Sequence, residues 1–124
     1  MNVSRQYLVI GSLYLLVGIF LGMYMGGKQD FTLAPVHAHI NLLGFTLMTV
    51  FGIAYRVMPG LAGNRLAMVH FWLHQVGALV LLIGLFLMMS GQMPESTAAK
   101  VLPVSEIVVF LGMAAWAINV FRNA

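Results

Sequence analysis

The sequence predicts an all-α integral membrane protein, a bundle of four transmembrane helices, on three observations. Hydrophobic residues make up 61% of the 124 residues and charged residues only 7%, with a mean hydropathy of +0.96, so the chain is too apolar for a small soluble domain. Four apolar runs each approach the length of about 20 residues that a helix needs to cross a bilayer. Segments rich in Gly, Pro, Asn, Gln and Ser separate these runs, as expected of turns. We therefore expect a single transmembrane domain over residues 1–124.

The four expected helices follow the hydropathy in chain order. The first run comes after Arg5 and lacks the small-residue cleavage pattern of a signal peptide, so we expect a retained span. The last run is expected to begin at Pro103, which places Glu106 near a helix N-terminus, where the helix dipole favours an acid. The predicted helices are 7–26, 35–58, 66–89 and 103–121, with connections at 27–34, 59–65 and 90–102.

The basic residues predict the orientation of the bundle. The side that holds both termini and the second connection carries four arginines, against two lysines on the other side: Arg5, Arg56, Arg65 and Arg122 against Lys28 and Lys100. Because cytoplasmic loops are enriched in Lys and Arg, we expect both termini inside, in a bacterial inner membrane. The net charge of +3 is spread along the chain and forms no patch for nucleic acid. Cysteine is absent, which excludes disulfides and thiolate metal sites.

Glycines on the first run predict a close helix contact. Gly18, Gly22 and Gly26 form consecutive small-xxx-small steps, which allow two helix backbones to approach each other closely. We expect this face to meet another helix of the same bundle, in preference to forming a dimerisation motif.

The second run contains the most informative segment, which reads Pro35-Val-His37-Ala-His39-Ile-Asn41-Leu-Leu-Gly44-Phe. Residues two apart on a helix point about 200° apart, so His37 and His39 suit two different centres better than one. On the His37 side lies a small and polar stripe that suits a cofactor or a tight helix contact, and on the His39 side lies an apolar wall. The stripe comprises Asn41, Gly44, Met48, Gly52 and Tyr55; the wall comprises Leu43, Thr46, Val50 and Val57.

A second histidine pair lies on the third run. Spacing of four residues puts His70 and His74 on one helix face, about 6 Å apart in rise. The two rings can share a metal, one can ligate while the other supports it, or both can be a satisfied polar pair with Gln75. Counting helix rises separates this pair from His37 and His39 by about 15 Å in depth, so we expect independent clusters.

The motif around His37 and His39, followed by Phe51-Gly52-Ile-Ala-Tyr55-Arg-Val-Met-Pro59, resembles a helix of the heme-copper oxidase catalytic subunit. It is most similar to the cytochrome cbb3 oxidase and nitric oxide reductase branch, and to short stand-alone bacterial proteins grouped with that subunit. The resemblance implies that His37 matches the ligand of the oxygen-reactive heme and His39 the ligand of the low-spin heme. Asn41 and Gly44, which stand beside these histidines, are expected to contact the cofactor.

The resemblance also implies an assembly. The family's catalytic subunit has twelve helices in three arcs of four, so three copies of this chain would rebuild the ring as a homotrimer. The chain lacks the adjacent His-His pair of the family's copper site, so the copper role is not carried over to His70 and His74. The two residues stay candidates for a second metal site, and copper stays a candidate cofactor of the chain beside heme.

The expected function is therefore a membrane protein that binds heme b and either transfers electrons or binds a diatomic gas such as O2 or NO. The number of axial histidines decides between these two roles. One alternative is a non-heme protein in which histidines bind copper or zinc. Another is an accessory subunit of a respiratory complex. No catalytic triad, carboxylate pair or phosphate-binding loop is present, so the sequence leaves enzyme activity open and assigns no catalytic residue.

Overall fold

The computed structural model describes all 124 residues and contains helices joined by short turns, without β-strands. Four helical rods are long and apolar enough to cross a membrane, which confirms the predicted all-α fold and the number of candidate spans. The second rod is built from three consecutive segments. The elements are α1 (Val3–Lys28), then α2 (Ala34–His39), the π-helix η1 (Ile40–Thr46) and α3 (Leu47–Val57) in one rod, the short 3-10 turn η2 (Pro59–Leu61), α4 (Arg65–Met89) and α5 (Glu95–Asn123).

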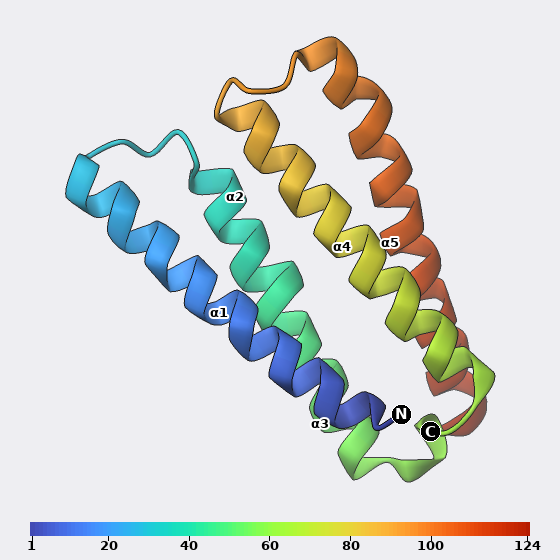
Figure 1. The fold of residues 1–124 in the computed structure, drawn as a ribbon. Helices are drawn as coiled ribbons and strands as arrows, with labels where there is room; N and C mark the ends of the chain where they lie inside the picture. The colour runs from blue at the N-terminus through green and yellow to red at the C-terminus, as the bar shows by residue number, and fades with distance from the viewer.

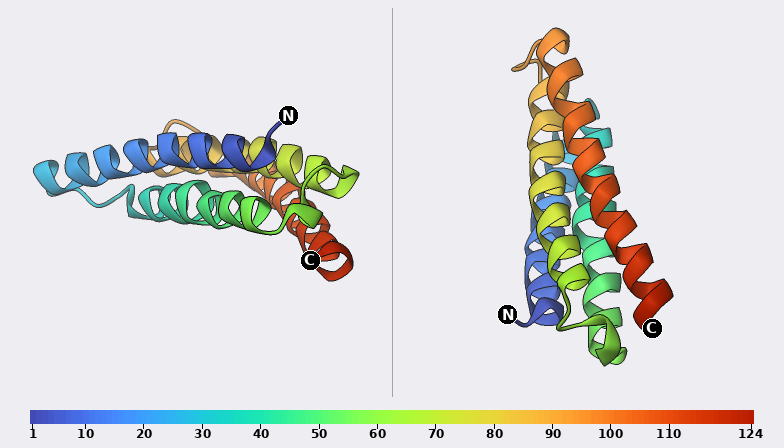
Figure 2. Two further views of the ribbon diagram at one scale, coloured as in Figure 1. Left: turned by 90° about the horizontal axis from the view of Figure 1, so that it is seen from below. Right: turned by 90° about the vertical axis from the view of Figure 1, so that its right-hand side faces the viewer.

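The rods form two antiparallel hairpins that lie side by side (Figure 1). One hairpin pairs α1 with the rod of α2, η1 and α3, and the other pairs α4 with α5. Both chain termini lie at the end of the bundle that also holds the η2 turn (Figure 1). Seen from the side, α5 leans away from α4 toward its C-terminal end (Figure 2).

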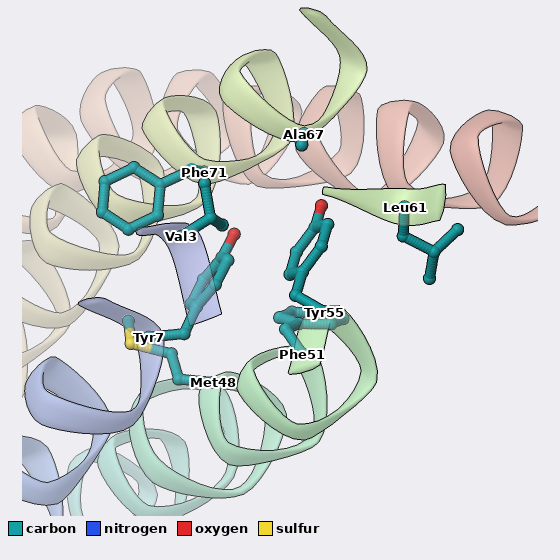
Figure 3. Close-up of a cluster of buried hydrophobic side chains, with 8 residues drawn as sticks. All are labelled: Val3, Tyr7, Met48, Phe51, Tyr55, Leu61, Ala67 and Phe71. Carbon is teal, nitrogen blue, oxygen red and sulfur yellow. The ribbon is translucent and has the colours of Figure 1, made fainter. Parts of the chain in front are cut away.

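The core sits at the end of the bundle that holds the termini. Eight buried residues from α1, α3, η2 and α4 form it, and Figure 3 shows them: Val3, Tyr7, Met48, Phe51, Tyr55, Leu61, Ala67 and Phe71. The outer surface is apolar, unlike the polar surface of a soluble protein. Large apolar side chains such as Phe20, Phe110 and Phe121 are 70%, 70% and 92% exposed. An apolar exterior of this kind matches a lipid environment and is typical of a multi-pass membrane protein.

The fourth helix begins earlier than the sequence indicated. α5 starts at Glu95, so the connection is the short turn 90–94 and the predicted connection 90–102 is wrong. The first eight residues of α5 include polar side chains, which hydropathy does not read as a span although they are compatible with helix. Pro103 lies inside α5 rather than at its start. Glu106 is therefore well past the first turn, and the expected dipole role at a helix N-terminus does not hold.

The remaining helix ends lie close to their predicted positions. Two of them are fixed by asparagine caps: the side chain of Asn2 accepts from the backbone N–H of Arg5 at 3.0 Å, and that of Asn64 accepts from Ala67 at 2.9 Å. Each cap satisfies an N–H group that the first helical turn leaves without a partner.

Candidate functional site

His37 lies half-buried against α1. Its Nδ1 donates to the carbonyl oxygen of Gly18 at 2.8 Å, and the side-chain amide of Asn41 donates to its Nε2 at 3.3 Å. Both ring nitrogens are therefore engaged within the bundle. Since a carbonyl only accepts, the hydrogen bond to Gly18 fixes the tautomer with the proton on Nδ1.

The glycines of α1 make this position possible. A Cβ atom on Gly22 would lie 2.9 Å from Cε1 of His37, and one on Gly18 would collide with Oδ1 of Asn41. Gly26 has open space instead. The predicted close helix contact is thus confirmed inside the chain for Gly18 and Gly22, while Gly26 takes no part in it.

The small and polar stripe of the second rod faces α1 along much of its length. Gly44 is buried against the ring of Tyr14, because a Cβ there would lie 2.6 Å from Cγ of that ring. Asn41 is half-buried, and its Oδ1 is buried with no hydrogen-bond partner. Of the two predicted uses of the stripe, the structure displays the tight helix contact, and cofactor contacts by Asn41 and Gly44 stay predictions.

His39 has the opposite environment. Its side chain is exposed on the outside of the bundle, and its Nδ1 donates to the carbonyl oxygen of Pro35 at 2.7 Å, one helical turn earlier. Its Nε2 makes no hydrogen bond within the chain. One ring nitrogen is thus anchored on a backbone acceptor, and the other is left with a free lone pair. The prediction that the two histidines face different directions is confirmed.

A π-helix follows His39 directly. In η1 the backbone pairs five residues apart, so the N–H of Leu47 donates to the carbonyl of Leu42. The side chain of His74 on α4 reaches the next carbonyl, with Nε2 at 3.1 Å from the oxygen of Leu43. The π-helix was not predicted from the sequence. Leu43 is buried in the structure, although the predicted apolar wall placed Leu43 on one face with Thr46 and Val50, which are exposed.

His70 and His74 are completely buried on one face of α4, with ring centroids 6.0 Å apart. The hydroxyl of Tyr55 lies 2.9 Å from Nδ1 of His70, and that of Tyr7 lies 3.2 Å from the same nitrogen. Figure 3 shows the rings of Tyr7 and Tyr55 with their hydroxyls turned toward α4. The two rings are nearly parallel, with an angle of 6° between their planes. Tyr55, the last residue of the predicted stripe, is therefore a buried partner of His70.

Of the three alternatives for the buried pair, the polar pairing with Gln75 is not formed, since the amide of Gln75 donates to the sulfur of Met48 at 3.6 Å. Nδ1 of His74 is buried without a partner. No three of the His, Asp and Glu side chains gather closely enough to hold one metal ion. His70 lies against Tyr7 and His37 against Gly18, eleven residues or about 17 Å farther along α1, so no single ion joins the two clusters.

Comparison of the chain with protein-family models, with curated proteins and with solved structures gave no match.

Proposed function

We propose that the protein is a membrane b-type hemoprotein related to the heme-copper oxidase catalytic subunit, and that His39 is its axial ligand. The observation that carries the proposal is the hydrogen bond from Nδ1 of His39 to the Pro35 carbonyl, 2.7 Å long, on an exposed face of the second rod. That bond holds the ring in one tautomer and leaves Nε2 as a free donor of a lone pair. The donor set fits heme iron, which takes imidazole ligands, and the bound heme would supply one-electron redox chemistry or a gas-binding position.

His37 supports the site from the interior. Its two nitrogens are held by Gly18 and Asn41, so it ligates only if the amide of Asn41 moves away from Nε2. The amide contact is 3.3 Å, longer than the 2.8 Å bond to Gly18, so it is the weaker of the two. His37 is thus the second candidate ligand, with its ring already oriented by the Gly18 carbonyl.

The exposure of His39 supports assembly. A single chain offers one free imidazole on a surface that also presents exposed apolar side chains such as Leu42 and Val50. A neighbouring copy would cover this surface and bring a second histidine, and three copies would complete the twelve-helix ring of the resembled subunit. In the proposed orientation both termini face the cytoplasm of a bacterium, and His39 stands in the outer half of the inner membrane.

The number of axial ligands separates the two possible activities. Two histidines close the coordination sphere and suit electron transfer, whereas one leaves a position for O2 or NO. Carbon monoxide distinguishes these cases because it binds reduced iron only at an open position. A shift of the reduced spectrum under carbon monoxide would indicate a gas-binding site, and an unchanged spectrum would indicate electron transfer.

The test is a titration of purified protein with heme, followed by native mass spectrometry. We expect saturable binding, a stoichiometry of up to three hemes for three chains, and a loss of binding in His39→Ala. The matched control is Val104→Ala, an exposed position on α5 away from the His39 surface, which should bind heme as the parent does. Absence of binding in the parent protein would contradict the proposal, and trimers without heme would separate assembly from cofactor. In that case metal analysis decides whether copper or zinc occupies the histidines instead.

A further inference from the structure

We infer that His74 is a positioning residue for His39, and that it acts through the carbonyl group of Leu43. The geometric link stands on the structure alone, while its consequence for a cofactor rests on the proposed function. The juxtaposition is unexpected from the sequence, since the contact joins residues of two different hairpins.

The hydrogen bond between His74 and Leu43 can have only one direction. A carbonyl oxygen accepts only, so Nε2 of His74 carries the proton and donates it to the oxygen of Leu43 at 3.1 Å. Nδ1 of His74 is then an unprotonated nitrogen, buried and without a partner. His74 is completely buried, so no water replaces this donor from outside. The side chain therefore serves as a fixed hydrogen-bond donor aimed at one backbone atom.

The change in backbone pairing explains why the Leu43 carbonyl needs a side-chain donor. The N–H of Leu47 reaches back five residues to Leu42, whereas α3 pairs four residues apart. A helix that changes from five-residue to four-residue pairing skips one carbonyl. After Leu42 the skipped carbonyl is that of Leu43, and the ring of His74 supplies its partner.

The π-helix controls where His39 points. A π-helix holds one residue more than an α-helix of the same length. This extra residue rotates the preceding segment, α2, by about 100° about the helix axis relative to α3. α3 itself is fixed by the core, in which Met48, Phe51 and Tyr55 are buried. His39 immediately precedes η1, so its outward direction depends on the extra residue staying between Ile40 and Thr46. By pairing with Leu43, His74 favours that location of the extra residue.

This link gives the second histidine pair a role that does not require a metal ion. His74 and His39 need not share an ion to influence each other, because the backbone of η1 connects them. His70 belongs to the same buried face but pairs with the tyrosine hydroxyls and makes no hydrogen bond to η1. His70 is therefore the natural control for His74.

The experiment uses the full chain without heme, labelled with ¹⁵N-histidine in lipid nanodiscs, with each histidine signal assigned by single replacement. In the parent protein we expect His74 protonated on Nε2. In His74→Phe, which keeps a ring but removes the donor, the ring nitrogen signals of His39 should shift. His74→Gln, which can restore a donor, should return them toward the parent values. His70→Phe should leave the His39 signals in place.

Heme titration of the same variants supplies the second readout. Removing a residue that orients a metal ligand typically lowers affinity about 10- to 100-fold, and we expect a loss of this size in His74→Phe and its recovery in His74→Gln. Unchanged His39 signals in His74→Phe, or equal shifts in His70→Phe, would overturn the inference. A proton on Nδ1 of His74 in the parent would also overturn it, even if His74→Phe does not fold. Shifted His39 signals in a chain that binds no heme would refute the proposed function and leave the positioning link standing.

Discussion

His37 and Gly18 are joined by a 2.8 Å hydrogen bond from the ring Nδ1 to the backbone carbonyl, and this bond requires α1 and α2 to lie almost in contact. Gly22, one turn further along α1, supplies the room, because any side chain there would meet the ring of His37. The approach of the two helices and the orientation of this histidine are therefore a single structural feature. A substitution that separates the two helices should therefore also change the orientation of His37.

The first prediction concerns the glycines of α1. Gly22→Ala should lower the free energy of unfolding by about 1–3 kcal/mol, since overpacking of a tight contact costs this much. It should also displace the ring of His37. Gly26→Ala is the control, because open space surrounds Gly26, and it should leave stability unchanged or raise it by up to about 1 kcal/mol. Equal effects of both changes in a detergent unfolding titration would contradict the helix contact.

The second prediction concerns the two hydroxyls on His70. Tyr7→Phe and Tyr55→Phe should each cost about 1 kcal/mol, because Nδ1 of His70 keeps the other hydroxyl. Tyr7→Phe should be the more costly of the two, since the Tyr7 hydroxyl also lies 3.3 Å from Nε2 of His70. The double variant should cost more than the sum, since it leaves a buried nitrogen without a partner. A double-mutant cycle of equilibrium unfolding measures this coupling. Tyr24→Phe, at a half-exposed ring of α1, is the control, and strictly additive costs would speak against a shared partner.

The third prediction concerns Asn119 on α5. Its amide donates to the carbonyl of Leu61 at 2.8 Å, and its oxygen accepts from Asn64 at 3.1 Å. Asn119→Leu should cost about 1–3 kcal/mol, because it removes both of these hydrogen bonds, although the Leu61 carbonyl keeps a second donor in the amide of Asn64 at 3.1 Å. Asn123→Ala removes only an exposed neighbour of the same network and should change stability by about 0.5 kcal/mol or less. Thermal unfolding monitored by circular dichroism checks both, and a neutral Asn119→Leu would refute the structural role.

The fourth prediction concerns the extra residue of the π-helix. Deleting Leu42, whose side chain is 59% exposed, should convert η1 to α-helix and turn His37 and His39 by about 100° relative to α3. The bond from His37 to Gly18 would break, and heme affinity should fall by about tenfold or more. Leu42→Ala keeps the residue count, so it should retain the π-helix and the bond from His37 to Gly18 and is the comparison for the deletion. A deletion variant with parental stability and heme binding would show that the π-helix has no role.

Much of the fold was predictable from hydropathy. Apolar runs of membrane-crossing length give four helices whatever the packing between them, and the first three ended close to their predicted bounds. The start of α5 was not predictable this way, because its first eight residues include polar side chains and a hydropathy profile reads them as a loop. Pro103 strengthened the error, since proline is common at helix starts.

The candidate site was predictable in part. The spacing of His37 and His39 requires opposite directions on a helix, and the structure has one facing α1 and the other facing outward. The π-helix was not predictable, because the donor to its Leu43 carbonyl is a histidine on another hairpin and the residues 40–46 carry no local pattern that indicates it. The tyrosine partners of His70 were missed for the same reason: Tyr7 lies 63 residues away in the chain.

The most direct test of the proposed function is the absorption spectrum of the purified protein, oxidised and dithionite-reduced, beside His39→Ala and His37→Ala. We expect b-type Soret and alpha bands in the parent, their loss in His39→Ala, and a weaker effect of His37→Ala on the amount of bound heme. A parent protein without heme absorbance after expression with ample heme, or a His39→Ala variant with undiminished bands, would contradict the proposed function.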